Sequence, residues 1–270
     1  MAEIKADGGG WRFACRAVLR AAGAGGRLLF PPVCAGCRRL VAEPGALCAR
    51  CWPSLRFIEA PLCPVMGTPF AHEMGEGFLS AEAITDPPLF SRARAAVIYE
   101  GVAGRMVQAL KYADRTDLAP WMARWMARAG HELIADADLV VPVPLHWRRF
   151  WSRRFNQSAE LGRALSERTG LRFAPEALVR AKNTRQQVGL RTRERTENVR
   201  AAFAVPEPFR PLVKHRRVIL VDDVFTTGAT VGAATRALLK GGAARVDVLT
   251  FARVLPGRTG DFLDDRGMHI

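Results

Sequence analysis

Long apolar runs are missing from this sequence of 270 residues, and no stretch reaches the roughly 20 apolar residues that a membrane-spanning helix needs. Near the N-terminus, Arg12, Arg16 and Arg20 interrupt the apolar residues, which argues against a signal peptide. We expect residues 1–30 to form a basic N-terminal segment whose short helix packs on the following domain, the alternative being contact with a membrane surface. The expectation is a cytoplasmic protein.

Cysteine is absent after residue 63, and four of the chain's six cysteines form two Cys-x-x-Cys pairs. This is the ligand spacing of a tetrahedral zinc site, and Pro44-Gly45 between the pairs favours a tight turn. Disulfides are the alternative, but the missing secretion signal argues against them. We predict a structural Zn²⁺, because four thiolates leave no open position for water or substrate. The predicted ligands are Cys34, Cys37, Cys48 and Cys51.

Two cysteines, Cys15 and Cys63, remain outside this set. The stretch Cys63-Pro64-Val65-Met66 resembles a third pair in which methionine has replaced the second cysteine. A second metal site is therefore not expected.

Acidic residues are scarce relative to basic ones, 26 against 40, which gives a formal net charge of +14. Such a charge favours anionic partners and does not by itself choose among nucleic acid, a membrane surface and a polyphosphate substrate. The segment from Trp147 to Arg200 holds 14 basic and 5 acidic residues, a surplus of 9. More than half of the chain's net charge lies in this segment.

The stretch from Arg217 to Gly242 carries the most informative pattern. Four consecutive apolar residues, Val218 to Val221, predict a strand buried on both faces, and Val231 to Leu239 has the apolar spacing of a helix. The acidic pair Asp222 and Asp223 ends the predicted strand. Between strand and helix lies a loop of small and hydroxyl residues: Thr226, Thr227, Gly228, Ala229 and Thr230.

This loop suits a phosphate, because a helix start offers unpaired amides and a positive dipole end, to which threonine hydroxyls add donors. The carboxylates of Asp222 and Asp223 suit its neighbours instead, either sugar hydroxyls or a hydrated Mg²⁺. The alternative is an ordinary buried strand whose polar turn caps a helix. Elsewhere, apolar spacing predicts strands at 95–99 and 138–144 and helices at 102–112 and 121–133.

The stretch from Arg217 to Thr230 resembles the phosphoribosyl pyrophosphate (PRPP) loop of the type I phosphoribosyltransferases. That resemblance implies an α/β fold with a mainly parallel sheet flanked by helices, and PRPP bound together with Mg²⁺. It assigns the ribose hydroxyls to Asp222 and Asp223 and the 5-phosphate to the loop 226–230. In members that act on 6-oxopurines, an acid three residues beyond the pair assists protonation of the base. Thr226 stands at that position here, which disfavours that route.

Two further motifs narrow the resemblance. Val141-Pro142-Val143-Pro144 is followed by an arginine pair and then by Arg153-Arg154-Phe155-Asn156-Gln157. This pattern is similar to the ComF family of competence-associated phosphoribosyltransferase-like proteins, which also carry an N-terminal zinc ribbon. The family's basic mobile segment falls on Thr184, Gln187, Leu190, Arg195, Asn198 and Phe203. The resemblance runs from about Pro31 to Leu255 and departs from the family at Met66 and at Arg154, where glycine is usual.

With PRPP at the loop 226–230, the strand end at Pro144 is expected next to it across the parallel sheet. The arginines after that strand are then placed to bind the pyrophosphate that leaves, and Lys182, Arg185 and Gln187 to close over it as a lid. A solvated basic loop is the alternative for 180–200. The candidate catalytic residues are Asp222, Asp223, Arg154, Lys182 and Arg185, and the further PRPP-binding residues are Arg148, Arg149 and Arg153.

Two functions remain open at this point. The first is a Mg²⁺-dependent transferase that passes phosphoribosyl from PRPP to an unknown acceptor. The second is a non-catalytic regulatory protein that binds single-stranded DNA and uses the fold as a nucleotide or PRPP sensor. The resemblance implies a link to DNA uptake, with competence or recombination proteins as partners. The expected segments are a zinc ribbon at 31–66, a linker at 67–92, the phosphoribosyltransferase-like domain at 93–255 and a polar tail at 256–270.

Overall fold

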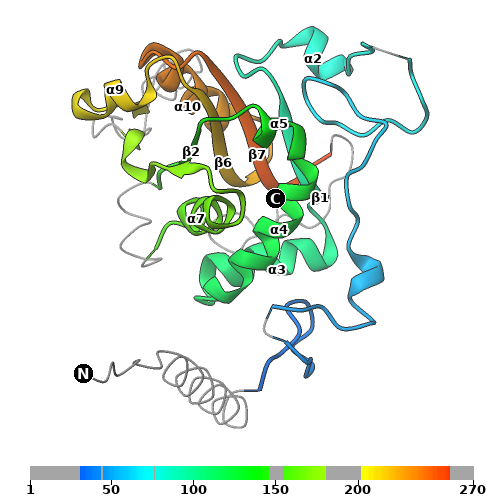
Figure 1. Cartoon of the computed structure of the whole chain (residues 1–270). Helices are drawn as coiled ribbons and strands as arrows, with labels where there is room; N and C mark the ends of the chain where they lie inside the picture. The colour runs from blue at the N-terminus through cyan, green and yellow to red at the C-terminus, as the bar shows by residue number, and fades with distance from the viewer. Residues whose placement is uncertain (1–30, 44, 76, 146–154, 181–201, 256–270) are drawn as a thin grey trace, which may run out of the picture.

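The computed structural model of the chain describes residues 31–43, 45–75, 77–145, 155–180 and 202–255. At its centre is a five-stranded sheet in the order β1-β7-β6-β2-β3 (Figure 1). Every pairing in this sheet is parallel, so the carboxyl ends of its strands meet at one edge. Its strands are β1 (Ala93–Ile98), β2 (Leu139–Pro142), β3 (Arg172–Phe173), β6 (Arg217–Phe225) and β7 (Arg245–Arg253). A separate antiparallel pair joins β4 (Val179–Arg180) to β5 (Phe203–Ala204).

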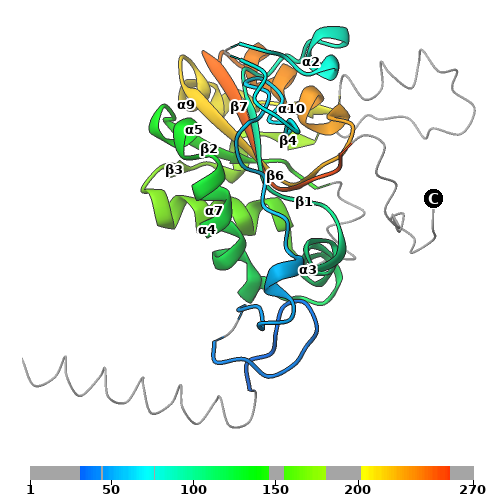
Figure 2. The ribbon, with the colours of Figure 1, turned by 90° about the vertical axis from the view of Figure 1, so that its right-hand side faces the viewer.

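Helices cover both faces of the sheet (Figure 2). On one face lie α3 (Gly101–Tyr112), α4 (Ala119–Ala129) and α7 (Gln157–Thr169), whose apolar residues meet Ile219 and Val221 of β6. On the other lie α9 (Arg210–Val213) and α10 (Ala229–Lys240), which meet Val218 and Leu220. The shorter helices are α2 (Ala81–Thr85), α5 (His131–Ala135), η1 (Trp52–Ser54), η2 (Thr116–Leu118), η3 (Pro175–Ala177) and η4 (Glu207–Phe209).

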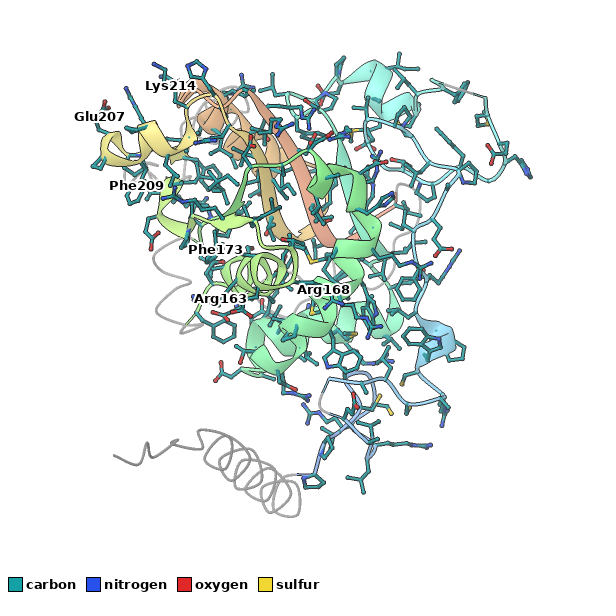
Figure 3. All side chains as sticks on the ribbon, viewed as in Figure 1. Arg163, Arg168, Phe173, Glu207, Phe209 and Lys214 are labelled. Carbon is teal, nitrogen blue, oxygen red and sulfur yellow. The ribbon has the colours of Figure 1, made fainter. Side chains whose placement is uncertain are left out.

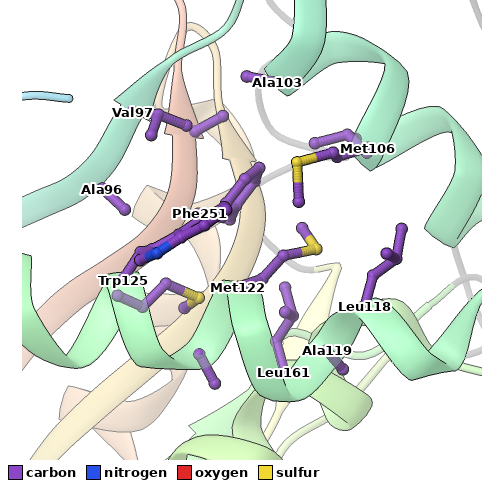
Figure 4. Close-up of a cluster of buried hydrophobic side chains, with 14 of the residues drawn as sticks. Ala96, Val97, Ala103, Met106, Leu118, Ala119, Met122, Trp125, Leu161 and Phe251 are labelled. Atoms are coloured by element: carbon purple, nitrogen blue, oxygen red, sulfur yellow. The ribbon is translucent and has the colours of Figure 1, made fainter. Parts of the chain in front are cut away.

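The predicted α/β class with a mainly parallel sheet is confirmed. Alternate residues of β6 enter opposite cores, which is why the strand reads as a continuous apolar run. In the core under α3 and α4, Trp125 stacks on Phe251 of β7 with ring centroids 6.2 Å apart, and Met106 and Met122 fill the space beside them (Figure 4). No helix in the described part of the chain has the length and apolar character needed to cross a bilayer.

Two predicted elements have different bounds in the structure. The single helix expected at 121–133 is split into α4 and α5 at Gly130, where a Cβ atom would lie 2.8 Å from Cδ1 of Leu249. A larger residue here would have to displace the side chain of Leu249 in β7, so the packing at the end of α4 favours glycine. Strand β6 continues to Phe225, so Asp222 and Asp223 lie within its last four residues rather than after its end.

The cysteine-rich segment packs next to α3, below it in Figure 2, rather than standing apart from the domain. Its buried Cys51 and Leu55 share a core with Val97 of β1 and Val102 of α3. Near the N-terminal part of α3, Arg105 Nε donates to the carbonyl oxygen of Gly36 at 2.8 Å. The segment 67–92, expected to be a linker, contains α2 and buries residues such as Ala83 and Phe90 in the second core.

Replacing Gly45 by alanine is expected to lower the free energy of unfolding by about 2 to 4 kcal/mol, because a positive φ and a steric clash act together. Gly45 has φ +77°, and its Cβ would lie 2.2 Å from Cδ1 of Trp121 in α4. Gly75→Ala is the matched control, since φ is +82° there but nothing lies within 4 Å of the added atom. Urea unfolding compares the two, and equal losses would contradict the clash with Trp121.

Candidate functional site

The acidic pair lies at the carboxyl edge of the sheet and is held by two helices. Asp223 is buried, and its Oδ2 lies 3.0 Å from Nζ of Lys111 near the end of α3. Asp222 is half-buried, and its Oδ1 accepts hydrogen bonds from Ser158 Oγ at 2.8 Å and from the backbone N–H of Asp223 at 2.9 Å. Elements far apart in sequence thus fix both carboxylates.

Burial, followed by the negative charge of Asp223, raises the pKa of Asp222 to about 7, although Ser158 and Lys111 act in the opposite direction. Burial is the largest single effect on Lys111 and lowers its pKa, but the charge of Asp223, its hydrogen bond to Lys111 and the charge of Asp222 together raise the pKa above its usual value. Lys111 therefore stays protonated at neutral pH while Asp222 is close to half-ionised. A bound metal or hydroxyl donors would favour its charged form.

The loop that follows β6 is open to solvent. Thr226 and Thr227 are exposed in this loop, and Gly228 caps α10 with φ +77°. The predicted loop 226–230 therefore ends at Gly228, and Ala229 and Thr230, both exposed, form the first turn of α10. A Cβ at Gly228 would lie 3.0 Å from Cζ of Phe225, so the turn needs glycine for both its backbone and its space. The first N–H groups of a helix have no partner within it, which makes the start of α10 suitable for an anion.

Strand β2 lies beside β6, as the sequence predicted. Pro142 pairs with Val221, and the N–H of Val143 donates to Val221 O at 2.9 Å. At the start of α7, Asn156 donates from Nδ2 to Val143 O at 3.0 Å and accepts from the N–H of Ser158 at 3.1 Å. This cap directs the first turn of α7 towards Asp222.

Several predicted site residues lie outside the described part of the chain, and their roles stay predictions. They are Arg148, Arg149, Arg153, Arg154, Lys182 and Arg185. The sequence reasoning missed Lys111 and Ser158. From the sequence, Lys111 was placed only within the predicted helix 102–112 and was given no role in a site. Ser158 directly follows Asn156-Gln157, the end of the arginine-rich motif, and was not singled out. One signal could have identified Lys111 as a partner of the acidic pair. It is a basic residue in the last turn of a helix that ends near the carboxyl edge of the sheet.

Other side chains on the face covered by α3, α4 and α7 stabilise the packing of these helices without contacting the acidic pair. Cζ of Arg163 in α7 lies 5.6 Å from the ring centroid of Phe173 in β3, a cation–π contact at the far edge of the sheet (Figure 3). Such a contact anchors α7 to β3. The position of Ser158 therefore depends on packing along the whole helix.

The four predicted zinc ligands come together. Their Sγ atoms all lie within 4.8 Å of one another, and those of Cys37 and Cys48 are 3.6 Å apart. A tetrahedral site with Zn–S bonds of about 2.3 Å needs sulfur separations of about 3.8 Å, so the cluster fits this metal. Cys34 Sγ accepts the N–H groups of Gly36 at 3.4 Å and Cys48 at 3.3 Å.

These amides affect how the cysteines titrate. Burial acts to raise the pKa of Cys34, but the N–H donors of its neighbours, Cys48 foremost, lower it to about 6. Burial raises the pKa of Cys51 to about 12. Zn²⁺ would supply the positive charge needed to hold all four groups as thiolates. With four sulfur ligands the site has no place for a substrate and is structural.

Two protein families match separate parts of the chain. The double zinc ribbon domain matches residues 26–83, and the phosphoribosyl transferase domain matches residues 167–261. The first match extends past the four-cysteine cluster into the segment that contains α2.

A second ribbon-like loop is visible in that segment. Cys63 repeats the arrangement of Cys34, because its Sγ accepts the N–H groups of Met66 and Ser80, both at 3.4 Å. Three residues beyond Cys63 and Ser80, where a Cys-x-x-Cys spacing would place the second ligand of each pair, stand Met66 and Ala83. Both are buried and apolar. Within the described residues, the four-cysteine cluster is the one group suited to a metal, and hydrogen bonds to Cys63 together with apolar packing hold the second loop.

Arg253, at the end of β7, joins the second loop to the candidate site. Its guanidinium is 2% exposed and donates to Met66 O and to Glu82 Oε2, each at 2.7 Å. The same group lies 4.3 Å from the ring centroid of Phe225, the residue before the exposed loop. Burial lowers the pKa of Arg253, and Glu82 opposes this effect. A buried cation thus fixes the ring on which Gly228 rests.

Whole-chain relatives agree with the two domains. The "DNA utilization protein YhgH" of Salmonella typhimurium is 32% identical over 235 residues, covering 84% of this chain and all of the relative. "Competence protein ComFC" of Bacillus subtilis is 26% identical over 211 residues, covering 77% of this chain and 84% of the relative. A solved structure, "Structure of the allosteric regulatory enzyme of purine biosynthesis", has 23% identity and a TM-score of 0.35, covering 50% of this chain and 26% of that one. With a zinc ribbon, a phosphoribosyltransferase domain and these relatives, the chain belongs to the ComF family of competence and DNA utilization proteins.

Proposed function

We propose that this protein binds PRPP with Mg²⁺ at the carboxyl edge of the sheet and transfers its phosphoribosyl group to an acceptor. One observation carries the proposal: Asp222 and Asp223 lie in the last four residues of β6, just before an exposed, hydroxyl-rich loop that leads into α10. Carboxylates suit the ribose hydroxyls, and the helix start suits the 5-phosphate. The names of the relatives support a role of this reaction in DNA uptake or utilization.

Each residue of the candidate site then has a part in binding PRPP. Lys111 neutralises Asp223 and keeps it aligned, while Ser158 orients Asp222 through its hydrogen bond. The hydroxyls of Thr226, Thr227 and Thr230 donate to the phosphate together with the first N–H groups of α10. When bound, Mg²⁺ would neutralise the charge of the leaving pyrophosphate. The acidic pair and the pyrophosphate itself offer the oxygen ligands that this metal prefers.

Calorimetric titration of PRPP into the zinc-loaded chain, with and without Mg²⁺, tests the proposal. Saturable binding that requires Mg²⁺ is the expected result. Ribose 5-phosphate serves as the control ligand, since it has the 5-phosphate but no pyrophosphate and should bind independently of the metal. Absence of binding at millimolar PRPP to folded protein would overturn the proposal.

A second function, binding of single-stranded DNA without transfer, has its own supporting observation. The segment 147–200 carries a surplus of 9 basic residues, a charge that favours phosphate backbones. Here affinity for an oligonucleotide should fall steeply with salt and should not require Mg²⁺. Salt titration by fluorescence anisotropy separates the two functions.

PRPP affinity is expected to increase as the pH rises from 6 to 8, because the pKa of Asp222 is raised to about 7 and the ionised carboxylate is the form that accepts ribose hydroxyls. The 5-phosphate also titrates near pH 6, so the variant Ser158→Ala supplies the comparison. Removing that donor raises the pKa of Asp222 further and should move the midpoint of the affinity curve to higher pH. Identical midpoints in the two proteins would contradict this role of Asp222.

The same shift predicts how stability depends on pH. An unfolded aspartate releases its proton near pH 3.9, whereas folded Asp222 retains it until about pH 7. The folded state therefore holds more protons across this window. The contribution of Asp222 to the free energy of unfolding is fully present below pH 4 and is lost as the pH rises through 7. Urea unfolding of wild type and Asp222→Asn at pH 5 and pH 8 measures the difference.

A further inference from the structure

A cavity of about 950 Å³ lies between the zinc ribbon and α3, outside the loop 226–230. The ribbon contributes one wall, with Gly36 and Arg38, and α3 contributes the other, with Gly104, Arg105 and Gln108. This volume is within the range of small-molecule sites. Neither domain alone would form it, since each supplies a different wall.

The cavity opens at the same edge of the sheet as the acidic pair. Tyr99, which lines it, directly follows β1, and β7 separates β1 from β6, so the two strand ends are about 10 Å apart. Gln108 and Lys111 are neighbours on the surface of α3, three residues apart. Gln108 Nε2 donates to Tyr99 Oη at 3.3 Å. A continuous row of polar groups therefore leads from the cavity to Asp223.

The lining is positively charged and partly bare of side chains. Arg38, Arg105 and Arg115 face one carboxylate, Glu100, which already pairs with Arg56 at 3.3 Å. Asp117 holds Arg115 by two hydrogen bonds, whereas neither Arg38 nor Arg105 forms an ion pair with any described residue. Gly36, Gly101 and Gly104 leave backbone without side chains along the walls.

An aromatic ring completes the lining. The side chain of Tyr99 lies against Gly104, with Cζ 3.8 Å from the position of an added Cβ. Arginines recognise phosphate, and a tyrosine ring offers a face on which a planar base can stack. This combination is the chemistry that recognises a nucleotide unit.

We propose that this cavity is the acceptor site and takes one nucleotide unit, with its phosphate on Arg38 and Arg105 and its base against Tyr99. The inference rests on the proposed function, because it places the acceptor beside PRPP. In the transfer, a nucleophilic atom of the acceptor forms a bond to the anomeric carbon. The bond from that carbon to pyrophosphate oxygen breaks, its electron pair leaves with pyrophosphate, and the acceptor's proton passes to solvent.

The test measures binding of two probes to the full zinc-loaded chain: deoxyadenosine 5′-monophosphate and a short fluorescent oligothymidylate. Arg38→Gln combined with Arg105→Gln is expected to weaken probe binding about tenfold or more, the usual loss of a charged hydrogen bond. Arg236→Gln is the matched control, because Arg236 is an exposed arginine on α10, on the other face of the sheet. An equal loss in the control would overturn the proposal.

A second variant fills the cavity without disturbing the fold. Gly104→Leu adds a side chain where only Tyr99 lies nearby, and leucine is a better helix former than glycine. This variant should melt no lower than wild type and should bind PRPP normally while losing the probes. Probe binding that survives in Gly104→Leu would overturn the proposal.

The two probes distinguish the source of the nucleotide. Binding of the mononucleotide indicates that the acceptor is a free nucleotide. Binding of the oligothymidylate alone indicates that the acceptor is a nucleotide within a DNA strand. Either result supports the proposed acceptor site if the variants lose probe binding as stated. Probe binding without PRPP binding would refute the proposed transferase and keep the cavity as a nucleotide site. PRPP binding with neither probe bound would refute the cavity and leave the PRPP site standing.

Discussion

Replacing Asp222 and Asp223 together by asparagine is expected to weaken Mg²⁺-dependent PRPP binding by about 100-fold or more, since two charged acceptors of about 1.5 to 3 kcal/mol each are removed. Both side chains lie before the exposed loop 226–230, where the ribose would sit between metal and phosphate. Asparagine keeps the shape of each group and one oxygen that accepts hydrogen bonds. The change therefore tests charge rather than packing.

Loss of the Asp223 charge also leaves the Lys111 ammonium partly buried without its counter-charge, which by itself destabilises the fold. The single variant Asp222→Asn avoids this effect, because Asp223 and Lys111 stay paired and Ser158 can still donate to the remaining oxygen. It should melt no lower than wild type, because the neutral amide avoids the cost of ionising Asp222, and still lose about tenfold in affinity. If PRPP affinity decreases only in variants that also lose their fold, the acidic pair has a structural role and does not bind PRPP.

Asp138→Asn is the matched control for removing a carboxylate. Asp138 precedes β2 and pairs with Arg217 at the start of β6, so it lies at the opposite edge of the sheet. The Arg217 guanidinium holds the pKa of Asp138 down at about 2. The control should lower stability slightly and leave PRPP affinity unchanged. Calorimetric titration of all three variants under one set of conditions makes the comparison.

Cys51→Ser is expected to release Zn²⁺ and unfold the ribbon, because the binding free energy of a structural zinc, about 10 to 16 kcal/mol in zinc-finger peptides, is folding free energy. Cys51 is buried, and its side chain lies in the core that joins the ribbon to Val97 and Val102. Losing the ribbon therefore uncovers part of α3 and removes one wall of the cavity. Zinc content by metal analysis and limited proteolysis measure the effect.

Cys63→Ser is the matched control, since Cys63 is equally buried and also accepts backbone N–H groups but lies outside the four-cysteine cluster. It should retain one zinc per chain. A chain that keeps its zinc after Cys51→Ser would contradict the assignment of the ligands. Two zinc ions per wild-type chain would contradict the metal-free second loop.

Ribbon loss also separates the two binding sites. The loop after β6, where we propose that PRPP binds, follows Phe225, whose ring contacts Arg253 and packs in the other core, far from the zinc ligands in the sequence. Zinc removal is therefore expected to abolish binding of a nucleotide probe while PRPP binding persists. The opposite order of losses would show that the ribbon supports the acidic pair itself.

Local spacing was sufficient to predict the parts of this protein that depend on neighbouring residues. Two Cys-x-x-Cys pairs specified the zinc cluster, because ligands three residues apart reach one metal whatever surrounds them. The strand, loop and helix from Arg217 to Lys240 followed from the apolar pattern and from Gly228. The positive φ of Gly228 forms the turn before α10 and is a local property of the chain. The neighbouring position of β2 and β6 followed from the rule that ligand sites gather at the carboxyl edge.

The tertiary structure alone decided what lies around those parts. Lys111 and Ser158 reach the acidic pair only because the sheet order and the packing of α3 and α7 bring distant segments together. Gly130, where the predicted helix is broken, packs against Leu249 of a strand far along the chain. The cavity needs both the ribbon and α3, and no local pattern encodes a space between two elements. The sequence determines which functional groups each segment carries, whereas long-range packing determines which of these groups lie within contact distance of one another.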